Sequence, residues 1–401
     1  TVVVSENGRK GDPGTNGTDG SGFNQVRKSM LDNPLCHLFK TNKLASASAP
    51  LGTDADVTWT RSTTATYVDR YGVVQTAAID TPREEKEGFL IEGASTNLAL
   101  YSEDITNAIY LFIGGEGSAI ADQYTAPDGL LTGDEITLND GNVLIRSGIG
   151  LVTGLTYTFS CWFLADTAAM TDVNVDFGDG TKGAVTGDVT SGIYTYLTYT
   201  AVCGANTHLD IEMKSASGGT VSMWGVHVRE LDFADSYIKT TASPVTRTAD
   251  IVSVSALNNV PQITGELSVS MTVNVKGAAT TSAMFIFQPT SGADIFGFRT
   301  YVSIASGTNV NVIGNTNPNV SGFSLSTEIN HVITYDQSSM EIYKDGTEVA
   351  TTTYVTPTKF IDTSSVLWIG KDHSTQAMFG HIKDLRIYDS KLNADEVEYL
   401  S

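Results

Sequence analysis

The sequence predicts a mainly β protein: two antiparallel β-sandwich domains preceded by a short triple-helical leader and a short helical segment. Three observations lead to this prediction. From Val57 onward, helical periodicity almost disappears, and short runs of alternating apolar and polar residues are bounded by Gly, Asn, Asp or Ser. Thr, Val, Tyr and Ile dominate these runs, as half-buried pleated surfaces favour. Many short strands without intervening helices indicate antiparallel sandwiches, and 401 residues suffice for two or three cores.

Composition and charge exclude several classes of protein. A hydrophobic fraction of 41% and a charged fraction of 17% are ordinary for a globular chain. The 24 Lys and Arg against 45 Asp and Glu give a net charge of -21, which repels phosphate backbones, so nucleic-acid binding is not expected. The sequence has no apolar run near the roughly 20 residues of a membrane helix and no readable signal peptide. We therefore expect neither membrane insertion nor Sec export from this terminus.

The leader, residues 1–22, contains a glycine at every third position. These glycines are Gly8, Gly11, Gly14, Gly17 and Gly20. Only glycine fits on the axis of three wound polyproline-type strands, so the repeat predicts a collagen-like triple helix and a homotrimer. Four triplets with one proline are too short to be stable alone, and a flexible linker is the alternative. A part of the chain further on must then hold the trimer together.

Residues 23–56 are predicted to form a short helical segment followed by a linker. Apolar residues recur at spacings of three and four with Pro34 between them, namely Val26, Met30, Leu35, Leu38 and Phe39. They indicate two short helical turns, which either form a three-chain bundle or dock on the next domain. Residues 45–56 are small and polar, as in a linker.

The strand-rich part divides into segments 57–252 and 264–401, joined by a linker over 253–263 that contains Pro261. Asp345 and Gly346 form a hairpin-turn dipeptide between alternating runs, and Asn393 is expected to cap a last short helix. No internal repeat of 20 to 30 residues is present, which argues against a β-helix.

The three cysteines are far apart in the chain and show neither CxxC nor Cys/His spacing. They are Cys36, Cys161 and Cys203. Neither a disulfide framework nor a zinc site is readable, so we expect buried thiols.

A spaced set of short motifs marks the start of the first sandwich segment. Residues 59–108, WTRSTTATYVDRYGVVQTAAIDTPREEKEGFLIEGASTNLALYSEDITNA, contain TRxSTATYxDxxG-like, PR, LIEGA-TNL and YSED elements. This stretch resembles a module of bacteriophage tail and fibre proteins. The chain that follows ends in MWGVHVRELDFADSYIKTTASPVTRTADIV and is similar to the jelly-roll, like carbohydrate-binding modules, that usually comes after that module. The resemblance covers residues 57 to about 252.

A second resemblance covers residues 264–401. GELSVSMTVNV, INHVITYDQSSMEIYKDGTEV and VLWIGKDHSTQAMFGHIKDLRIYDSKLNADEVEYL are similar to a concanavalin A-like, laminin-G-type sandwich. The resemblance implies this fold and a habit of binding glycans or proteins. Fold alone does not establish function.

No catalytic motif is readable. Glu84, Glu85 and Glu87 form the densest acidic cluster and are expected to lie, with Arg83 and Lys86, on a solvated charged turn. No carboxylate pair stands out for glycan cleavage, and GxSxG and histidine spacings typical of a triad are absent. We expect no enzyme activity, although a triad of residues distant in sequence stays open.

Two groups of carboxylates are candidates for a metal. Asp172, Asp176 and Asp179 surround a glycine turn and offer the oxygen ligands that calcium prefers, without EF-hand spacing. A plain Asp-Gly turn is the alternative. Because laminin-G-type sandwiches often hold a calcium ion at the rim, Asp372 is a second candidate. No cofactor is expected beyond such a structural calcium ion.

Aromatic side chains in the first sandwich segment suggest a sugar site. Alternation places Trp162 opposite a core-like set, and places His227 and Arg229 opposite Trp224, Val226 and Val228. Trp162, His227 and Arg229 are predicted to line one exposed, concave sheet on which a sugar could stack. The alternative is that Trp162 packs against a neighbouring subunit.

A polar loop over residues 314–322 is a second candidate sugar site. The side-chain amides of this loop suit sugar hydroxyls and belong to Asn315, Asn317 and Asn319. An ordinary polar loop is the alternative.

With the glycine repeat, the resemblance to bacteriophage tail and fibre proteins implies a homotrimeric virion protein, a tail fibre or receptor-binding protein that recognises host-surface polysaccharide. It would be assembled in the host cytoplasm and docked to other virion proteins through its N-terminus, where TVVVSEN is β-prone. Two alternatives stay open: a structural or decorating fibre on the capsid or tail, and a polysaccharide depolymerase or deacetylase.

Overall fold

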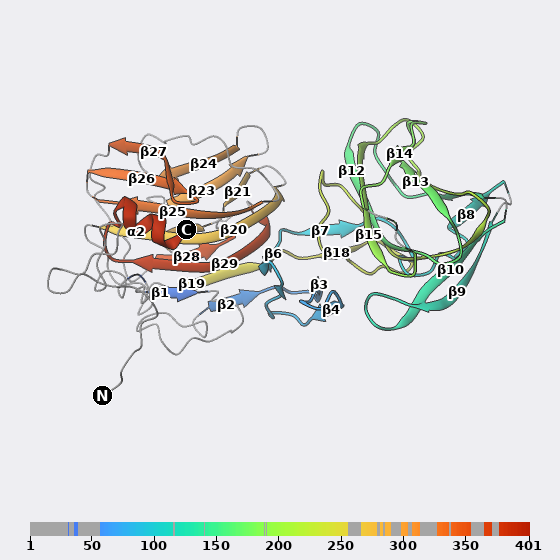
Figure 1. Ribbon diagram of the computed structural model, residues 1–401, viewed down its shortest axis with the longest axis horizontal. Coiled ribbons are helices and arrows are strands. Elements are labelled where there is room, and N and C mark those ends of the chain that lie inside the picture. Colours follow the sequence, from blue (N-terminus) through green and yellow to red (C-terminus); the bar gives the residue numbers. More distant parts are fainter. Residues whose placement is uncertain are drawn as a thin grey trace, which may run out of the picture. The chain divides into compact units, whose positions relative to one another are not determined.

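The computed structural model describes residues 31, 36–38, 57–114, 117–139, 141–187, 189, 191–255, 266–278, 281–283, 285–289, 298–303, 307–312, 327–336, 338–353, 365–370 and 377–401. The chain folds into two compact units (Figure 1). The N-terminal domain consists of residues 60–86 and 92–250. The C-terminal domain consists of 87–91, 251–401 and the residues before Thr60. The described part of the chain contains no helix with the length and apolarity of a membrane span.

The N-terminal domain is a sandwich of two five-stranded antiparallel sheets, with orders β15-β12-β17-β10-β9 and β14-β13-β16-β11-β8 (Figure 1). Their strands are β8 (Tyr110–Ile113), β9 (Gly117–Thr125), β10 (Leu131–Leu138), β11 (Asn142–Ser147), β12 (Thr156–Ala165), β13 (Met170–Asp176), β14 (Gly183–Ala184), β15 (Thr195–Val202), β16 (Leu209–Ser215) and β17 (Gly219–Arg229). The remaining strands are β3 (Ala65–Val68), β4 (Val74–Ala77), β5 (Glu84–Glu85), β7 (Ser95–Asn97) and β18 (Val245–Arg247), in which β3 pairs with β4 and β7 with β18.

Alternation in the sequence produces the core of this domain. Phe159, Cys161 and Phe163 of β12 are buried together with Val175 of β13 and Ile211 of β16. One face of each sheet therefore packs on the other, as period-two patterning requires. The predicted mainly β, sandwich-type fold is confirmed.

A bulge in β17 changes the predicted faces of that strand. Ser160 pairs with His227 and Trp162 with Trp224, so Gly225 and Val226 together oppose Cys161. Gly225 has a φ of 71°, which favours glycine. Val226 and Val228 face the core as predicted, but Trp224 lies on the opposite face with Trp162. The prediction that Trp224 shares their side is wrong because alternation does not persist through a bulge.

The C-terminal domain contains a sheet of order β27-β26-β25-β20-β29-β6, in which β1 also pairs with β29, and a sheet of order β2-β19-β28-β22. The strands are β1 (Cys36–Leu38), β2 (Val57–Thr60), β6 (Gly88–Ile91), β19 (Ile251–Ser255), β20 (Leu267–Ala278), β22 (Phe285–Pro289), β25 (Glu328–Tyr335), β26 (Ser339–Lys344), β27 (Thr347–Thr353), β28 (Ser365–Ile369) and β29 (Met378–Tyr388). A third sheet joins β21 (Thr281–Ala283), β23 (Phe298–Ser303) and β24 (Gly307–Val312). Val254, Val269 and Ile369 belong to one buried core.

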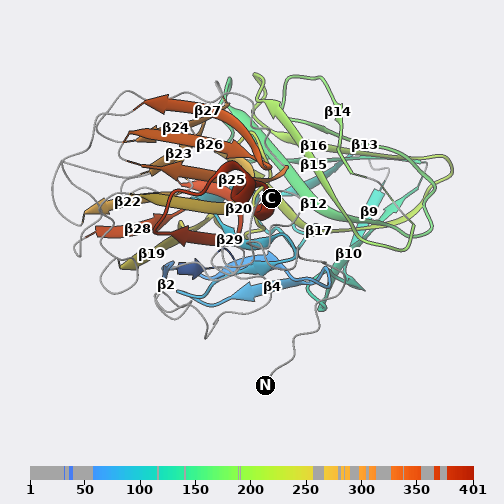
Figure 2. The same cartoon turned by 60° about the vertical axis from the view of Figure 1, so that its left-hand side comes forward.

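The predicted C-terminal turn and helix cap are confirmed. Asp345 and Gly346, with φ of 47° and 76°, connect β26 to β27 as a tight hairpin turn. Asn393 caps α2 (Ala394–Leu400) through a capping box with Glu396. The helix packs on the face of the sheet that carries β25, β26 and β29 (Figures 1 and 2).

Two expectations about segment boundaries need correction. Cys36–Leu38, predicted within helical turns, forms a strand because it pairs with Leu385–Ile387 of β29, whereas Leu31 is helical and buried. The segment 264–401 is not self-contained, since β19 and β6, from outside it, pair with its strands β28 and β29. The leader glycines lie outside the described residues.

A buried carboxylate in the N-terminal domain makes its stability depend on pH. Asp134 is fully buried and accepts hydrogen bonds from the backbone N–H groups of Ile105 (2.6 Å) and Asp122 (3.0 Å). Burial raises its pKa to about 6, helped by the charges of Asp104 and Asp122 and opposed by the two N–H donors.

The first prediction follows from this raised pKa. Because the folded state holds this proton up to a higher pH than the unfolded chain, the contribution of Asp134 to stability is lost as pH rises through about 6. Lowering the pH from 7 to 5 should therefore stabilise the wild type relative to Asp134→Asn, which does not titrate. Thermal midpoints of both proteins across this range measure the difference. Parallel curves would contradict the account.

Candidate functional site

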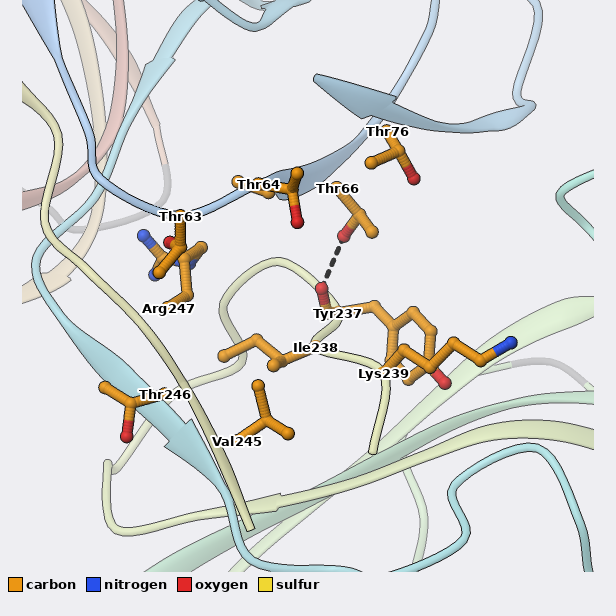
Figure 3. A pocket seen from close by; sticks show the side chains of 11 residues that line it. Thr63, Thr64, Thr66, Thr76, Tyr237, Ile238, Lys239, Val245, Thr246 and Arg247 are labelled. Atoms are coloured by element: carbon orange, nitrogen blue, oxygen red, sulfur yellow. Dashed lines mark hydrogen bonds between the residues drawn. The ribbon is translucent and has the colours of Figure 1, made fainter. Parts of the chain in front are cut away.

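A pocket of about 480 Å³ lies within the N-terminal domain, lined largely by threonine side chains (Figure 3). One side is formed by the β3–β4 hairpin and the residues just before it. The other is formed by the loop 237–239 and by β18. Segments that are about 170 residues apart in the sequence therefore build one site, as the bond between Thr66 and Tyr237 records.

Three threonines form the hairpin side of the pocket. Thr66 and Thr76 are paired across β3 and β4, and Thr64 precedes Thr66 by two residues, so strand alternation puts all three on one face. The Thr66 hydroxyl donates to the carbonyl oxygen of Tyr237 over 2.5 Å (Figure 3). Within the described part of the chain, no hydrogen bond engages the hydroxyls of Thr64 and Thr76. Both are exposed and available to a ligand.

Two aliphatic side chains lie on the opposite side of the pocket. Ile238 is 6% exposed and Val245 is 38% exposed. In Figure 3, Ile238 and Val245 lie across the pocket from Thr64 and Thr76. The pocket thus sets hydrogen-bonding groups against an apolar surface, as small-molecule sites commonly do.

Two cations line the ends of the pocket, and each has a carboxylate partner. The Nζ of Lys239 lies 2.5 Å from Oε2 of Glu103. The Nη2 of Arg247 lies 3.2 Å from Oδ2 of Asp235 and 3.4 Å from Oε2 of Glu92. Lys239 is largely exposed, whereas Arg247 is buried. Figure 3 places the two side chains at opposite ends.

A buried network of arginines and carboxylates adjoins this pocket. Arg83 is completely buried and binds two carboxylates, with Nη1 2.8 Å from Glu92 Oε2 and Nη2 2.5 Å from Asp250 Oδ2. Arg61 Nη1 lies 2.8 Å from the other oxygen of Asp250. Burial by itself would raise the pKa of Glu92, but Arg247 and Arg83 hold it well below its ordinary value. Glu92 is therefore ionised at neutral pH.

Two arginines of the network also fix the hairpin side of the pocket. Arg83 Nη1 donates to the carbonyl oxygen of Thr66 over 2.9 Å. Arg61 Nε donates to the carbonyl oxygen of Thr63 over 2.9 Å. Because a buried charge must keep its partners, these bonds hold the threonine backbone in one position.

The residues predicted to form an exposed sugar platform do share one face, but that face is covered. His227 and Arg229 are 0% exposed. Arg229 Nε lies 2.5 Å from Asp235 Oδ1, and Arg229 Nη2 donates to Nδ1 of His227 over 3.0 Å. Burial, with Arg229 and Arg247 nearby, lowers the pKa of His227 well below its ordinary value, so it is neutral. The prediction of an exposed face is therefore wrong for His227 and Arg229.

Trp162 belongs to an aromatic cluster and not to an open platform. Its ring centroid lies 4.7 Å from that of Tyr196, 5.2 Å from that of Trp224 and 5.7 Å from that of Tyr237. Trp162 is partly buried against Trp224 and Tyr237, and Tyr237 also lines the pocket. Part of the Trp162 ring is therefore covered by protein side chains.

Of the three predicted calcium ligands, Asp176 and Asp179 lie together in one turn, whereas Asp172 lies apart from them. Asp176 lies with His208 and Asp210, whose ligand atoms are all within 4.8 Å of one another, whereas Asp172 is exposed and opposite Lys214. Asp176 instead accepts the backbone N–H groups of Asp179 and Gly180 at 3.0 and 3.1 Å, which is the Asp-Gly turn given as the alternative.

A cation at this group of ligands would have to compete with Arg146. Its Nε and Nη2 contact the two carboxylate oxygens of Asp210 at 2.7 and 2.8 Å. The positive charge that Asp210 needs is thus supplied by the protein.

Other predicted residues lie wholly or partly outside the described residues. Cys161 and Cys203 are buried free thiols as expected, whereas the side chain of Cys36 is not described. The candidates outside the described residues are Asn315, Asn317, Asn319 and Asp372. These four stay predictions.

Sequence reasoning missed the pocket and the network. It placed Arg83 on a solvated turn, yet Arg83 is fully buried, because its charge is matched by Glu92 and Asp250. A signal was present: Arg61, Arg83 and Glu92 belong to the TR, PR and LIEGA elements quoted above, and Arg247 with Asp250 belongs to TRTAD. The motif residues converge in the structure on one network.

Comparison with known families gives one match. Residues 246–398 match the model of the Concanavalin A-like lectin/glucanases superfamily. A search of curated proteins gave no significant match. The C-terminal region thus has the concanavalin A-like, laminin-G-type character expected from its sequence.

A search of solved structures gave matches that each cover a part of the chain. A heptameric SAP-like pentraxin from Limulus polyphemus is 16% identical with a TM-score of 0.29, covering 35% of this chain and 71% of its own. The CBM40 of the Ruminococcus gnavus IT-sialidase, bound to alpha2,3 sialyllactose, is 14% identical with a TM-score of 0.30, covering 34% and 82%. Domain 4 of AbnA, an arabinanase from Geobacillus stearothermophilus in complex with arabinotriose, is 14% identical with a TM-score of 0.30, covering 42% and 81%.

Proposed function

We propose that this chain is a homotrimeric attachment protein of a bacteriophage virion that recognises glycans on the host surface. The observation that carries the proposal is the pocket of the N-terminal domain. It combines free threonine hydroxyls with an aliphatic surface, and its cations are matched by carboxylates. Sugars present both hydroxyl groups and C–H faces, so this chemistry suits them.

Two further features support the proposal. The motifs over residues 59–108 resemble those of bacteriophage tail and fibre proteins, and in the structure their charged residues build the frame of the pocket. The match of residues 246–398 to the concanavalin A-like lectin/glucanase model supports a second domain able to bind glycans or proteins. An external position on the virion, assembled in the host cytoplasm and attached through the N-terminus, belongs to the same proposal.

The second prediction concerns the oligomer. Three copies on one fibre would turn weak single sites into useful attachment, because linked binding events multiply. Light scattering on the intact chain is expected to give about three times its mass of 42.7 kDa. Deleting residues 1–22, which leaves β1 in place, should weaken the trimer because the glycine repeat is removed. A stable monomer of the intact chain would contradict the proposal.

The test of the function is binding of the intact protein to purified surface polysaccharides from a panel of bacteria, measured by biolayer interferometry. Polysaccharide from strains lacking the outer chains is the matched control. Binding to one or a few polysaccharides, without release of reducing sugar or acetate, supports the proposal. Binding to none favours a structural or decorating fibre, and release of product favours a depolymerase or deacetylase.

A further inference from the structure

We infer that the pocket takes a single uncharged sugar residue and that Thr64 and Thr76 determine which sugar it accepts. This inference rests on the proposed function and adds to it the class of ligand and the residues that read it. It is carried by three observations: two free hydroxyls, an aliphatic surface opposite them, and cations that are already neutralised.

The free hydroxyls are the first observation. Of the threonines that line the pocket, Thr66 donates to the Tyr237 carbonyl oxygen. Thr63 bonds the backbone N–H of Thr248 at 3.1 Å, and Thr246 pairs with Thr96 at 2.7 Å. Only Thr64 and Thr76, among the lining threonines of the described chain, have hydroxyls with no partner. Each can both donate and accept, as recognition of a sugar hydroxyl requires.

The frame behind these two residues is rigid. Thr66, which lies between them on the hairpin, is held through its carbonyl oxygen by Arg83 and through its hydroxyl by Tyr237. Both partners are buried, Tyr237 at 4% exposure and Arg83 at 0%. The backbone that carries Thr64 and Thr76 is therefore held on the hairpin, and this limits the spacing of their hydroxyls and so the arrangements of sugar hydroxyls that they can bind.

The second observation is that the two cations lining the pocket already have carboxylate partners. The cation of Lys239 has Glu103 as its partner, and that of Arg247 has Asp235 and Glu92. The Nε and Nη1 of Arg247 have no hydrogen-bond partner among the described residues, but both atoms are shielded from solvent. A carboxylate or phosphate in the pocket would have to displace an existing carboxylate or lose its own hydration, and this favours an uncharged ligand.

The third observation is the apolar surface across the pocket from the free hydroxyls. Ile238 and Val245 offer aliphatic contact at the side opposite the hydroxyls, where the C–H face or a methyl group of a pyranose can pack. Burying such a surface supplies the non-directional part of the affinity, while the two threonines supply direction.

The test, which is our third prediction, uses the intact protein and a panel of methyl glycosides in saturation-transfer NMR. The panel contains methyl glucoside, galactoside, mannoside, rhamnoside and N-acetylglucosaminide, with methyl glucuronide and galacturonide as charged members. We expect one neutral glycoside to bind best. The affinity for that glycoside should fall about three- to tenfold or more in the Thr64→Val, Thr76→Val double variant, because hydrogen bonds are lost without a change in side-chain shape. Thr125→Val, an exposed substitution on β9 outside the pocket, is the matched control.

Each outcome separates this inference from the function on which it rests. A uronide that binds better than every neutral glycoside overturns the uncharged class. If the double variant binds glycosides and whole polysaccharide as well as the wild type does, the pocket is not the sugar site. The attachment function would then depend on another surface of the protein. A wild type that binds no surface polysaccharide overturns the function itself.

Discussion

Replacing Arg83 with methionine is expected to destabilise the N-terminal domain by about 3 to 5 kcal/mol, the cost of breaking a buried ion pair by removing one partner. Arg83 is 0% exposed and neutralises both Glu92 and Asp250. Without Arg83, Glu92 keeps Arg247 as a cationic partner and Asp250 keeps Arg61. Both carboxylates then stay buried with one arginine fewer to neutralise them. The measurement is urea unfolding, with hydrogen exchange of β12 and β17 peptides to assign the loss to this domain.

The matched control is Arg70→Met. The Nη2 of Arg70 lies 3.6 Å from Oε1 of Glu84, and the two side chains are 52% and 33% exposed. Such surface pairs contribute about 0 to 1 kcal/mol, so the control should change little. If Arg83→Met costs no more than Arg70→Met, the buried network does not hold the domain together. Since Arg83 also holds the Thr66 carbonyl, the variant should lose glycan binding as well.

Replacing Trp162 with alanine is expected to destabilise the same domain by about 3 kcal/mol. The indole packs against the rings of Tyr196, Trp224 and Tyr237, and its removal leaves a cavity among them. The sequence alone predicted an exposed platform, for which the substitution would lower glycan binding and leave stability unchanged.

Thermal unfolding and glycan binding of Trp162→Ala and Trp162→Phe decide between these two descriptions. Phenylalanine keeps most of the packing and should recover most of the stability. Full stability of the alanine variant combined with lost binding would contradict the packed cluster and restore the platform.

The strand content and sandwich class could be predicted from the sequence because they depend on local alternation. Phe159, Cys161 and Phe163 alternate in the sequence and face the core in the structure. Asn393 and the Asp345-Gly346 turn are also local signals, and both were found. Local patterns cannot show a bulge, since the extra residue in β17 depends on its pairing with β12.

The candidate site could not be predicted in the same way, because long-range pairing creates it. In the sequence, Arg83 looks like a surface residue because it stands beside Glu84, Glu85 and Lys86. It is buried because it binds Asp250, which lies 167 residues further along the chain. Likewise, His227 and Arg229 alternate away from the core as expected, but a covering loop that contains Asp235 removes them from solvent. Period-two patterning separates faces, and tertiary contacts decide which face is open.

The most direct test of the account is a crystal structure of the intact protein with an oligosaccharide cut from the host polysaccharide to which it binds. The account places one uncharged sugar residue in the pocket, with its hydroxyls bonded to Thr64 and Thr76 and its C–H face against Ile238 and Val245. A sugar bound only in the C-terminal domain, with an empty pocket, would contradict it.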